Sequence, residues 1–197
     1  MELEASKAKK NTGLLPQFEN PLATSASEDD LTVDRNHQAI NFTSTRKALR
    51  RLFDQAKALT GDQLAQETAE LFQTSLGVDI FWIARIDETR MRFTILGGKA
   101  KSGGSAKGSS LVLKNSPFEP IPLEKCVIYP RNALIRFANN PYMLKYNING
   151  IITCPICLSG KVVGLLIAMN ATTIRHPNEI CRLMTEAASE LAELVFS

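Results

Sequence analysis

Histidine is scarce in this chain, which has only His37 and His176 among 197 residues. His37 lies in a polar N-terminal stretch, and His176 directly precedes a proline that suits the start of a helix. No local spacing brings together a nucleophile, a base and an orienting acid, and ligands for a metal ion are equally hard to assemble. The sequence therefore predicts a protein that is not an enzyme and that holds no metal.

Long apolar runs are also lacking. The opening residues are charged instead of forming the apolar part of a signal peptide, and no later run approaches the ~20 residues of a membrane span. We therefore expect a cytoplasmic protein that does not enter a membrane. In that compartment its four cysteines, Cys126, Cys154, Cys157 and Cys181, are expected to be reduced thiols.

Motifs for phosphate or nucleic acid are absent as well. Residues 99–110 read KAKSGGSAKGSS, but the glycine spacing does not match a phosphate-binding loop and no helical pattern follows. No basic surface interleaved with aromatic residues indicates nucleic-acid binding. We interpret 99–110 as a flexible loop. Alternatively, the six basic residues between Arg90 and Phe118, where no acidic residue occurs, attract an anionic ligand or an acidic partner.

Composition divides the chain into a tail and one domain. Residues 1–44 are polar, show no apolar period and are predicted to be a disordered tail, whose short apolar islands could dock on a partner. Residues 1–45 carry four basic and seven acidic side chains, whereas the remainder carries 19 basic and 13 acidic ones. With 44% hydrophobic residues overall, we expect one folded domain over residues 45–197.

The most distinctive local pattern is GIITCPICLSGKVVGLLIAMN, residues 150–170. Two apolar runs flank the pair Ser159-Gly160, and Gly160 can adopt the positive φ of a tight turn, so the segment predicts a β-hairpin. Both runs are apolar at nearly every position, which is typical of strands that lie centrally in a sheet.

Other periodicities predict the remaining elements. Apolar residues at three- and four-residue spacing predict helices after N-caps at Ser44 and Asp62, and a third over residues 177–197. Shorter strands are predicted at 78–87, 91–95 and 111–113. The connection 115–141 contains five prolines yet many apolar and aromatic residues, so we expect a loop that packs over the core or over a bound molecule. This order of elements indicates the α+β class.

Four segments resemble the GAF domain: LGVDIFWIARID (76–87), SPFEPI (116–121), IRFANNPYM (135–143) and the hairpin. The likeness is to GAF domains of bacterial signalling proteins that carry tPCE.V, FP.D..L and YlGvPL.d..G.viG.l segments, and it covers roughly residues 46–197. The resemblance implies a central antiparallel sheet of five to six strands with the N- and C-terminal helices on one face. It also implies a loop-covered small-molecule pocket on the other face and a homodimer formed by the terminal helices.

The pocket residues that we expect are aromatic and apolar side chains beside one cation, a combination that suits a planar or anionic ligand. They are Phe118, Tyr129, Arg136, Phe137, Tyr142 and Met143.

Several departures from the family pattern leave the cofactor unknown. Phe118 stands where the PCE segment has cysteine, Ala138 where FP has proline, and Asn140 where an acidic residue is usual. The NKFDE signature of cyclic-nucleotide-binding GAF domains is absent. Bilin-binding GAF domains usually attach the chromophore through a cysteine that is followed by histidine, and no cysteine of this chain is followed by histidine.

The cysteines invite two interpretations. Cys154 and Cys157 lie three apart in a predicted strand, so they point to opposite faces with Cα atoms ~10 Å apart, too far for a disulfide or a shared zinc ion. We expect them to be buried, inert thiols. Cys126 follows Lys125 in the loop region, where a nearby cation favours the thiolate, so it is a candidate reactive thiol.

Three functions follow. The leading hypothesis is a non-enzymatic sensory or regulatory protein that binds a small molecule and signals through its terminal helices to a separate output protein. The first alternative is a ligand-free interaction or dimerisation module whose partner is a kinase, cyclase or transcription factor. The second is a thiol-based reductase similar to the GAF-fold reductases of free methionine sulfoxide, for which only Cys126 qualifies.

Overall fold

The computed structural model describes residues 40–87, 89, 91–99, 104–114, 116–119 and 125–197. The predictions for most of the tail, and for residues 100–103 of the predicted loop, lie outside these residues.

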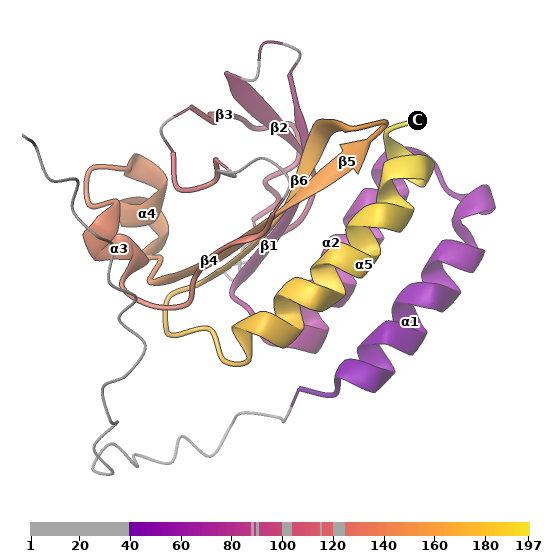
Figure 1. Ribbon diagram of the computed structural model, residues 1–197, viewed down its shortest axis with the longest axis horizontal. Helices are drawn as coiled ribbons and strands as arrows, with labels where there is room; N and C mark the ends of the chain where they lie inside the picture. Colours follow the sequence, from indigo (N-terminus) through magenta and orange to yellow (C-terminus); the bar gives the residue numbers. More distant parts are fainter. Residues whose placement is uncertain (1–39, 88, 90, 100–103, 115, 120–124) are drawn as a thin grey trace, which may run out of the picture. The chain divides into compact units, whose positions relative to one another are not determined.

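An antiparallel sheet forms the centre of the described chain, with the strand order β3-β2-β1-β6-β5-β4 (Figure 1). The six strands confirm the predicted α+β class and the expected five to six strands. Their bounds are β1 (Ile80–Ile86), β2 (Arg92–Gly97), β3 (Ser110–Val112), β4 (Val127–Tyr129), β5 (Gly150–Leu158) and β6 (Lys161–Asn170).

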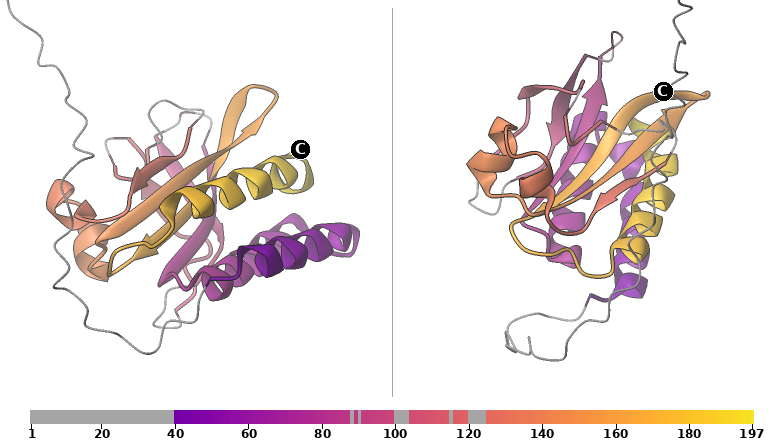
Figure 2. Two further views of the ribbon diagram at one scale, coloured as in Figure 1. Left: turned by 60° about the horizontal axis from the view of Figure 1, so that its bottom comes forward. Right: turned by 60° about the vertical axis from the view of Figure 1, so that its left-hand side comes forward.

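The helices lie on both sides of this sheet, as the two views in Figure 2 show. On one side, α2 (Gly61–Leu76) and α5 (Pro177–Val195) pack on the strands, and α1 (Phe42–Asp54) packs against these two helices. A 3-10 turn, η1 (Ala56–Ala58), follows α1. The short helices α3 (Ala133–Arg136) and α4 (Pro141–Tyr146) lie on the other side. The expected placement of the terminal helices on one face is therefore confirmed.

The central hairpin forms as predicted. Ser159 and Gly160 have φ angles of 51° and 74°, and positive φ at both positions is the mark of the turn that suits the twist of a two-residue hairpin. Strand β6 lies between β1 and β5, and β5 lies between β6 and the short β4. Side chains of both strands point alternately into two buried clusters, one on each face of the sheet, which explains why their sequences do not alternate.

The two predicted N-caps are wrong by a few residues. The side chain of Asn41, not Ser44, caps α1 by accepting the Ser44 N–H at 3.0 Å. Thr60, not Asp62, caps α2, and Gln63 completes a reciprocal capping box. The predicted boundary between residues 44 and 45 therefore falls within α1. Both errors arise because several polar residues near a helix start can cap it equally well.

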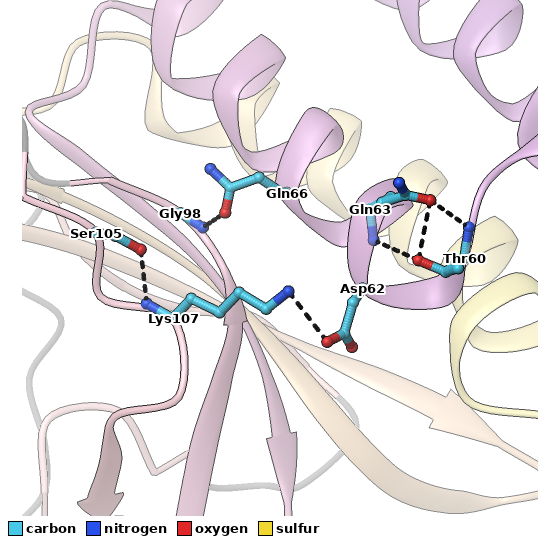
Figure 3. A network of polar contacts seen from close by, with 7 residues as sticks. All are labelled: Thr60, Asp62, Gln63, Gln66, Gly98, Ser105 and Lys107. Carbon is cyan, nitrogen blue, oxygen red and sulfur yellow. Dashed lines mark hydrogen bonds and ion pairs between the residues drawn. The ribbon is translucent and has the colours of Figure 1, made fainter.

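Polar contacts tie the first turns of α2 to the connection between β2 and β3 (Figure 3). The Lys107 ammonium lies 3.1 Å from the Asp62 carboxylate, and Gln66 Oε1 accepts the Gly98 N–H at 2.9 Å. Ser105 Oγ accepts the Lys107 N–H at 3.2 Å within the connection itself. The described part of the predicted flexible loop is therefore held against a helix.

A second ion pair reaches α2 from the same segment. Lys99 lies 2.6 Å from Glu70, and hydrogen bonds from Lys99 and then Gln66 hold the pKa of Glu70 below its usual range. Two of the six basic residues that we considered as attractors of an anion thus already face carboxylates of this chain.

Helix α2 approaches the end of β2 so closely that only glycine fits at position 97. A Cβ atom on Gly97 would lie 2.5 Å from the carbonyl carbon of Ala65 and 2.5 Å from the Gln66 nitrogen. Backbone atoms cannot yield as a flexible side chain can, so this contact sets the distance between helix and sheet.

We expect Gly97→Ala to lower the free energy of unfolding by about 1–3 kcal/mol, because it forces α2 away from the sheet. Urea unfolding followed by circular dichroism measures the change. Gly104→Ala is the matched control, since no atom lies within 4 Å of its added Cβ. Equal unfolding midpoints for the two variants would show that the close approach does not constrain the fold.

Candidate ligand-binding face

Alternating side chains of the strands build two separate cores. Phe81 and Ile83 of β1 point toward the helices α2 and α5, where the larger core lies. Trp82 and its neighbours Ile80 and Ala84 point to the opposite face, where they meet side chains of α3, α4 and the loops around them. This second core is the face on which the pocket was predicted.

Two of the predicted pocket residues are fully buried in this second core. The Phe118 ring lies 6.2 Å from that of Trp82 and 5.5 Å from that of Phe93, centroid to centroid. Met143 of α4 is equally buried. Both side chains therefore pack as part of the cover on the sheet.

Three others form a cluster at the margin of the same core. The rings of Tyr129 and Phe137 meet edge to face at 5.3 Å, and the Arg136 guanidinium lies 4.8 Å from the first ring and 5.9 Å from the second. Arg136 is exposed, whereas Tyr142 is half-buried against the core. The predicted combination of aromatic rings and one cation is present, and its role in binding stays a prediction.

The sequence interpretation missed the two residues that stand out on this face. Trp82 Nε1 and Thr153 Oγ1 are buried polar atoms that have no hydrogen-bond partner among the described residues. Trp82 and Thr153 both pair with Ile167 of β6, so they lie in one row across three strands, about 10 Å apart. Because Ile152 and Cys154 point to the helices, the strand alternation turns Thr153 to the same face as Trp82.

A sequence signal for Thr153 existed. It is a hydroxyl-bearing residue inside the apolar run 151–158, at a position where a buried side chain needs a partner. The absence of that partner depends on the packing around it and could not be inferred from the run alone.

The expected cause of Cys126 reactivity is wrong. Instead of a lysine lowering the pKa of Cys126, a hydrogen bond with the Cys154 thiol and burial raise that pKa far above its usual range. Burial and the Cys126 thiol likewise raise the pKa of Cys181 to about 12. The prediction that Cys154 and Cys157 are both buried is also wrong in part, because Cys157 is exposed.

A shallow cleft of about 510 Å³ lies elsewhere, beside the hairpin end of β6. Arg85 on its wall donates a hydrogen bond to the Val195 carbonyl at 3.0 Å and stacks 5.3 Å from the Phe196 ring centroid. None of the predicted pocket residues lines it.

In the part of the chain that the structure describes, no three His, Cys, Asp or Glu side chains are arranged to hold a metal ion. No helix among these residues combines the length and apolar character needed to cross a bilayer.

Comparison by sequence gives no relative: no protein-family model and no curated protein matches the chain. Solved structures do match it. The GAF domain of an Acinetobacter phosphoenolpyruvate-protein phosphotransferase superposes with a TM-score of 0.65 at 18% identity, covering 76% of this chain and 91% of that one. The phycoerythrobilin-bound GAF domain of a cyanobacterial phytochrome gives a TM-score of 0.64 at 13% identity, over 80% of this chain and 95% of that one.

A third match is an enzyme. The free methionine-R-sulfoxide reductase of Neisseria meningitidis, solved in complex with its substrate, has a TM-score of 0.64 at 10% identity and covers 81% of this chain and 93% of that one. The chain therefore has the GAF fold, as the resemblance implied. Since this fold serves both a chromophore-binding domain and a reductase, function has to be argued from the site.

The thiol environments predict an order of alkylation. Near neutral pH, iodoacetamide should modify the exposed Cys157 first, and Cys126 and Cys181 about tenfold or more slowly, because little of either is thiolate. Peptide mass spectrometry during the reaction measures each rate. If Cys126 reacts first, it is a reactive thiol, as the sequence predicts, and the raised pKa is contradicted.

Proposed function

We propose that this chain is a non-enzymatic sensory or regulatory GAF-fold protein that binds a small molecule between the sheet and the cover formed by α3 and α4. The observation that carries the proposal is the pair of buried, unpartnered polar side chains, Trp82 and Thr153, in one row of the sheet. Binding would be passed through the strands to the terminal helices and from there to a separate output protein.

The two side chains define what the ligand must offer. A buried polar group without a partner costs about 1–3 kcal/mol, so a molecule that pairs with it gains that free energy on binding. The indole N–H of Trp82 only donates, whereas the Thr153 hydroxyl donates or accepts. The remaining wall is aliphatic and aromatic. These features favour a flat, largely apolar molecule with a hydrogen-bond acceptor near Trp82 and a second polar group about 10 Å away.

The cluster of Tyr129, Phe137 and Arg136 at the margin of the second core favours a ligand that carries a negative charge. The exposed Arg136 guanidinium is stacked on Tyr129, which packs against the same core. A ligand that extends from Thr153 toward β4 would place an anionic group near this cation, since Thr153 is paired with Val127 of β4.

Entry of the ligand requires movement of the cover. Phe118 packs on Trp82 and Met143 is buried over the same face, so a ligand that reaches the indole displaces these side chains. The ligand would therefore favour a conformation in which the cover is shifted, and this difference between two states is what a sensor needs.

The helices that would report the change are joined to one another. Arg46 of α1 donates two hydrogen bonds to the Glu186 carboxylate of α5, at 2.6 and 3.0 Å, and this pairing lowers the pKa of Glu186. A shift of α5 on the sheet would thus also move α1.

Trp82 is the chain's sole tryptophan, so its fluorescence reports on the site directly. Native mass spectrometry of the protein from its own host would first identify a bound molecule. Titration of the emptied protein with that molecule should then shift or quench the emission. Thr153→Val should weaken binding about two- to tenfold, the effect of one lost hydrogen bond.

Thr68→Val is the matched control for this experiment. Thr68 of α2 is a buried threonine whose hydroxyl also lacks a partner, but it belongs to the helix side of the sheet. The same substitution there should leave the affinity unchanged. Equal affinity of both variants and the parent would reject the proposed site, and a protein that carries no molecule under any growth condition would reject the sensor.

Exposed apolar side chains support a second candidate, a ligand-free interaction module. Ile135 of α3 is 78% exposed and Leu144 of α4 is 59% exposed, and such residues on neighbouring short helices suit a protein partner. The reductase alternative has less support, because the raised pKa of Cys126 disfavours the thiolate that a thiol-based reductase uses.

We further propose a homodimer that uses the outer flank of α5, where Leu194 is 39% exposed. Leu194→Glu should then convert the dimer to a monomer in light scattering, because it places a charge in an apolar contact. Leu144→Glu, an exposed leucine on the opposite side of the sheet, should leave the dimer intact. A monomeric parent protein at micromolar concentration would contradict the dimer.

A further inference from the structure

Three of the four cysteines come together on the helix side of the sheet, although they are far apart in the sequence. Cys126 directly precedes β4, Cys154 lies on β5 and Cys181 lies on α5. The hydroxyl of Thr185 lies 3.5 Å from Cys126 Sγ and 3.6 Å from Cys154 Sγ. The same hydroxyl donates to the Cys181 carbonyl at 2.9 Å.

The register of the sheet brings Cys126 and Cys154 opposite each other. In the β4–β5 pair, Val127 lies opposite Thr153 and Ile128 opposite Ile152. One further step in this register places Cys126 directly opposite Cys154. Opposite residues of antiparallel strands have Cα atoms about 4.5–5.5 Å apart, which falls within the range of about 4.4–6.8 Å that a disulfide spans.

We propose that Cys126 and Cys154 form an oxidation site, at which a hydroperoxide converts the two thiols into a cross-strand disulfide between the chain entering β4 and strand β5. This oxidation site is separate from the proposed ligand-binding face, because the two thiols lie on the opposite side of the sheet.

Exposure decides the order of the two steps. Cys126 is half-buried and meets the oxidant, whereas Cys154 is 2% exposed. The Cys126 thiolate attacks one oxygen of hydrogen peroxide, the O–O bond breaks, and the departing hydroxide takes up a proton to give water and a sulfenic acid. The Cys154 sulfur then attacks Cys126 Sγ, and the S–O bond breaks with release of a second water. Two thiols lose two electrons and two protons, and one peroxide becomes two waters.

The surroundings of Cys126 make its reaction with peroxide slow. Because the pKa of Cys126 is raised by Cys154 and by burial, little thiolate is present near neutral pH. The second step needs no access for the oxidant, since the register places the two residues opposite each other and both thiols contact the same Thr185 hydroxyl. The site is therefore suited to prolonged exposure to peroxide.

The disulfide would fix the edge of the sheet. Strand β4 has three residues and, in the described part of the chain, pairs with β5 alone, so a covalent link beside it prevents this edge from separating. Tyr129, at the far end of β4, belongs to the proposed ligand-binding face, and any effect of oxidation on ligand binding rests on the proposed function.

The test starts from the Cys157→Ser protein, which lacks the exposed thiol that would otherwise oxidise between molecules. This protein is incubated with hydrogen peroxide and its intact mass is recorded. Its remaining thiols are then alkylated for peptide mapping without reduction. The expected result is a loss of about 2 Da and a peptide pair linked through Cys126 and Cys154.

Three further variants separate this pair from its neighbours. Cys126→Ser and Cys154→Ala should each abolish the loss of mass, whereas Cys181→Ser should retain it. The linked peptide is read in the Cys157→Ser parent, so the result stands even if a core variant unfolds. A parent that gains oxygen without losing the two hydrogens, or that links Cys126 to Cys181 instead, would overturn the proposal.

Discussion

Burial of β6 on both faces is the constraint on which the rest of this structure depends. It lies between β1 and β5 and carries apolar side chains alternately toward two cores. Each core must then be closed by another layer, because a two-sided apolar sheet cannot face water. Helices α2 and α5 close one side, and α3, α4 and their connections close the other. The first cover consists of long helices, whereas the second consists of short helices and irregular connections.

The irregular cover places aromatic and aliphatic side chains over the sheet. Among the described residues, Trp82 and Thr153 find no hydrogen-bond partner on this face, and Thr68 finds none on the helix side. Such groups are uncommon in folded proteins, since each costs free energy, and the proposed ligand would supply partners for the two on the covered face. The GAF fold of the matched structures accommodates this use, but it also accommodates catalysis.

The two faces also separate two kinds of chemistry. The aromatic rings and Arg136 gather on the covered face, whereas three thiols gather beneath α5 on the helix face. The thiols influence one another and lose acidity, which is the opposite of what Lys125 alone suggested. The pKa of Cys126 depends more on Cys154, on the adjacent strand, than on its sequence neighbour Lys125, because charge and burial act through space.

The sequence by itself determined the type of the main helices and of five strands, the hairpin turn at Ser159-Gly160 and the covering of both sheet faces. Strand β4 lies in the connection that was predicted to be a loop. The sequence also singled out aromatic residues that lie in or beside the second core, and their role in binding stays a prediction. Only the tertiary structure decided that Phe118 and Met143 fill the cover and that Trp82 and Thr153 share a row. It also decided the register of β4 on β5, which brings Cys126 opposite Cys154 when it is continued by one residue. These facts arise from the pairing of strands that are distant in the chain, and no local pattern encodes which distant residue will lie opposite.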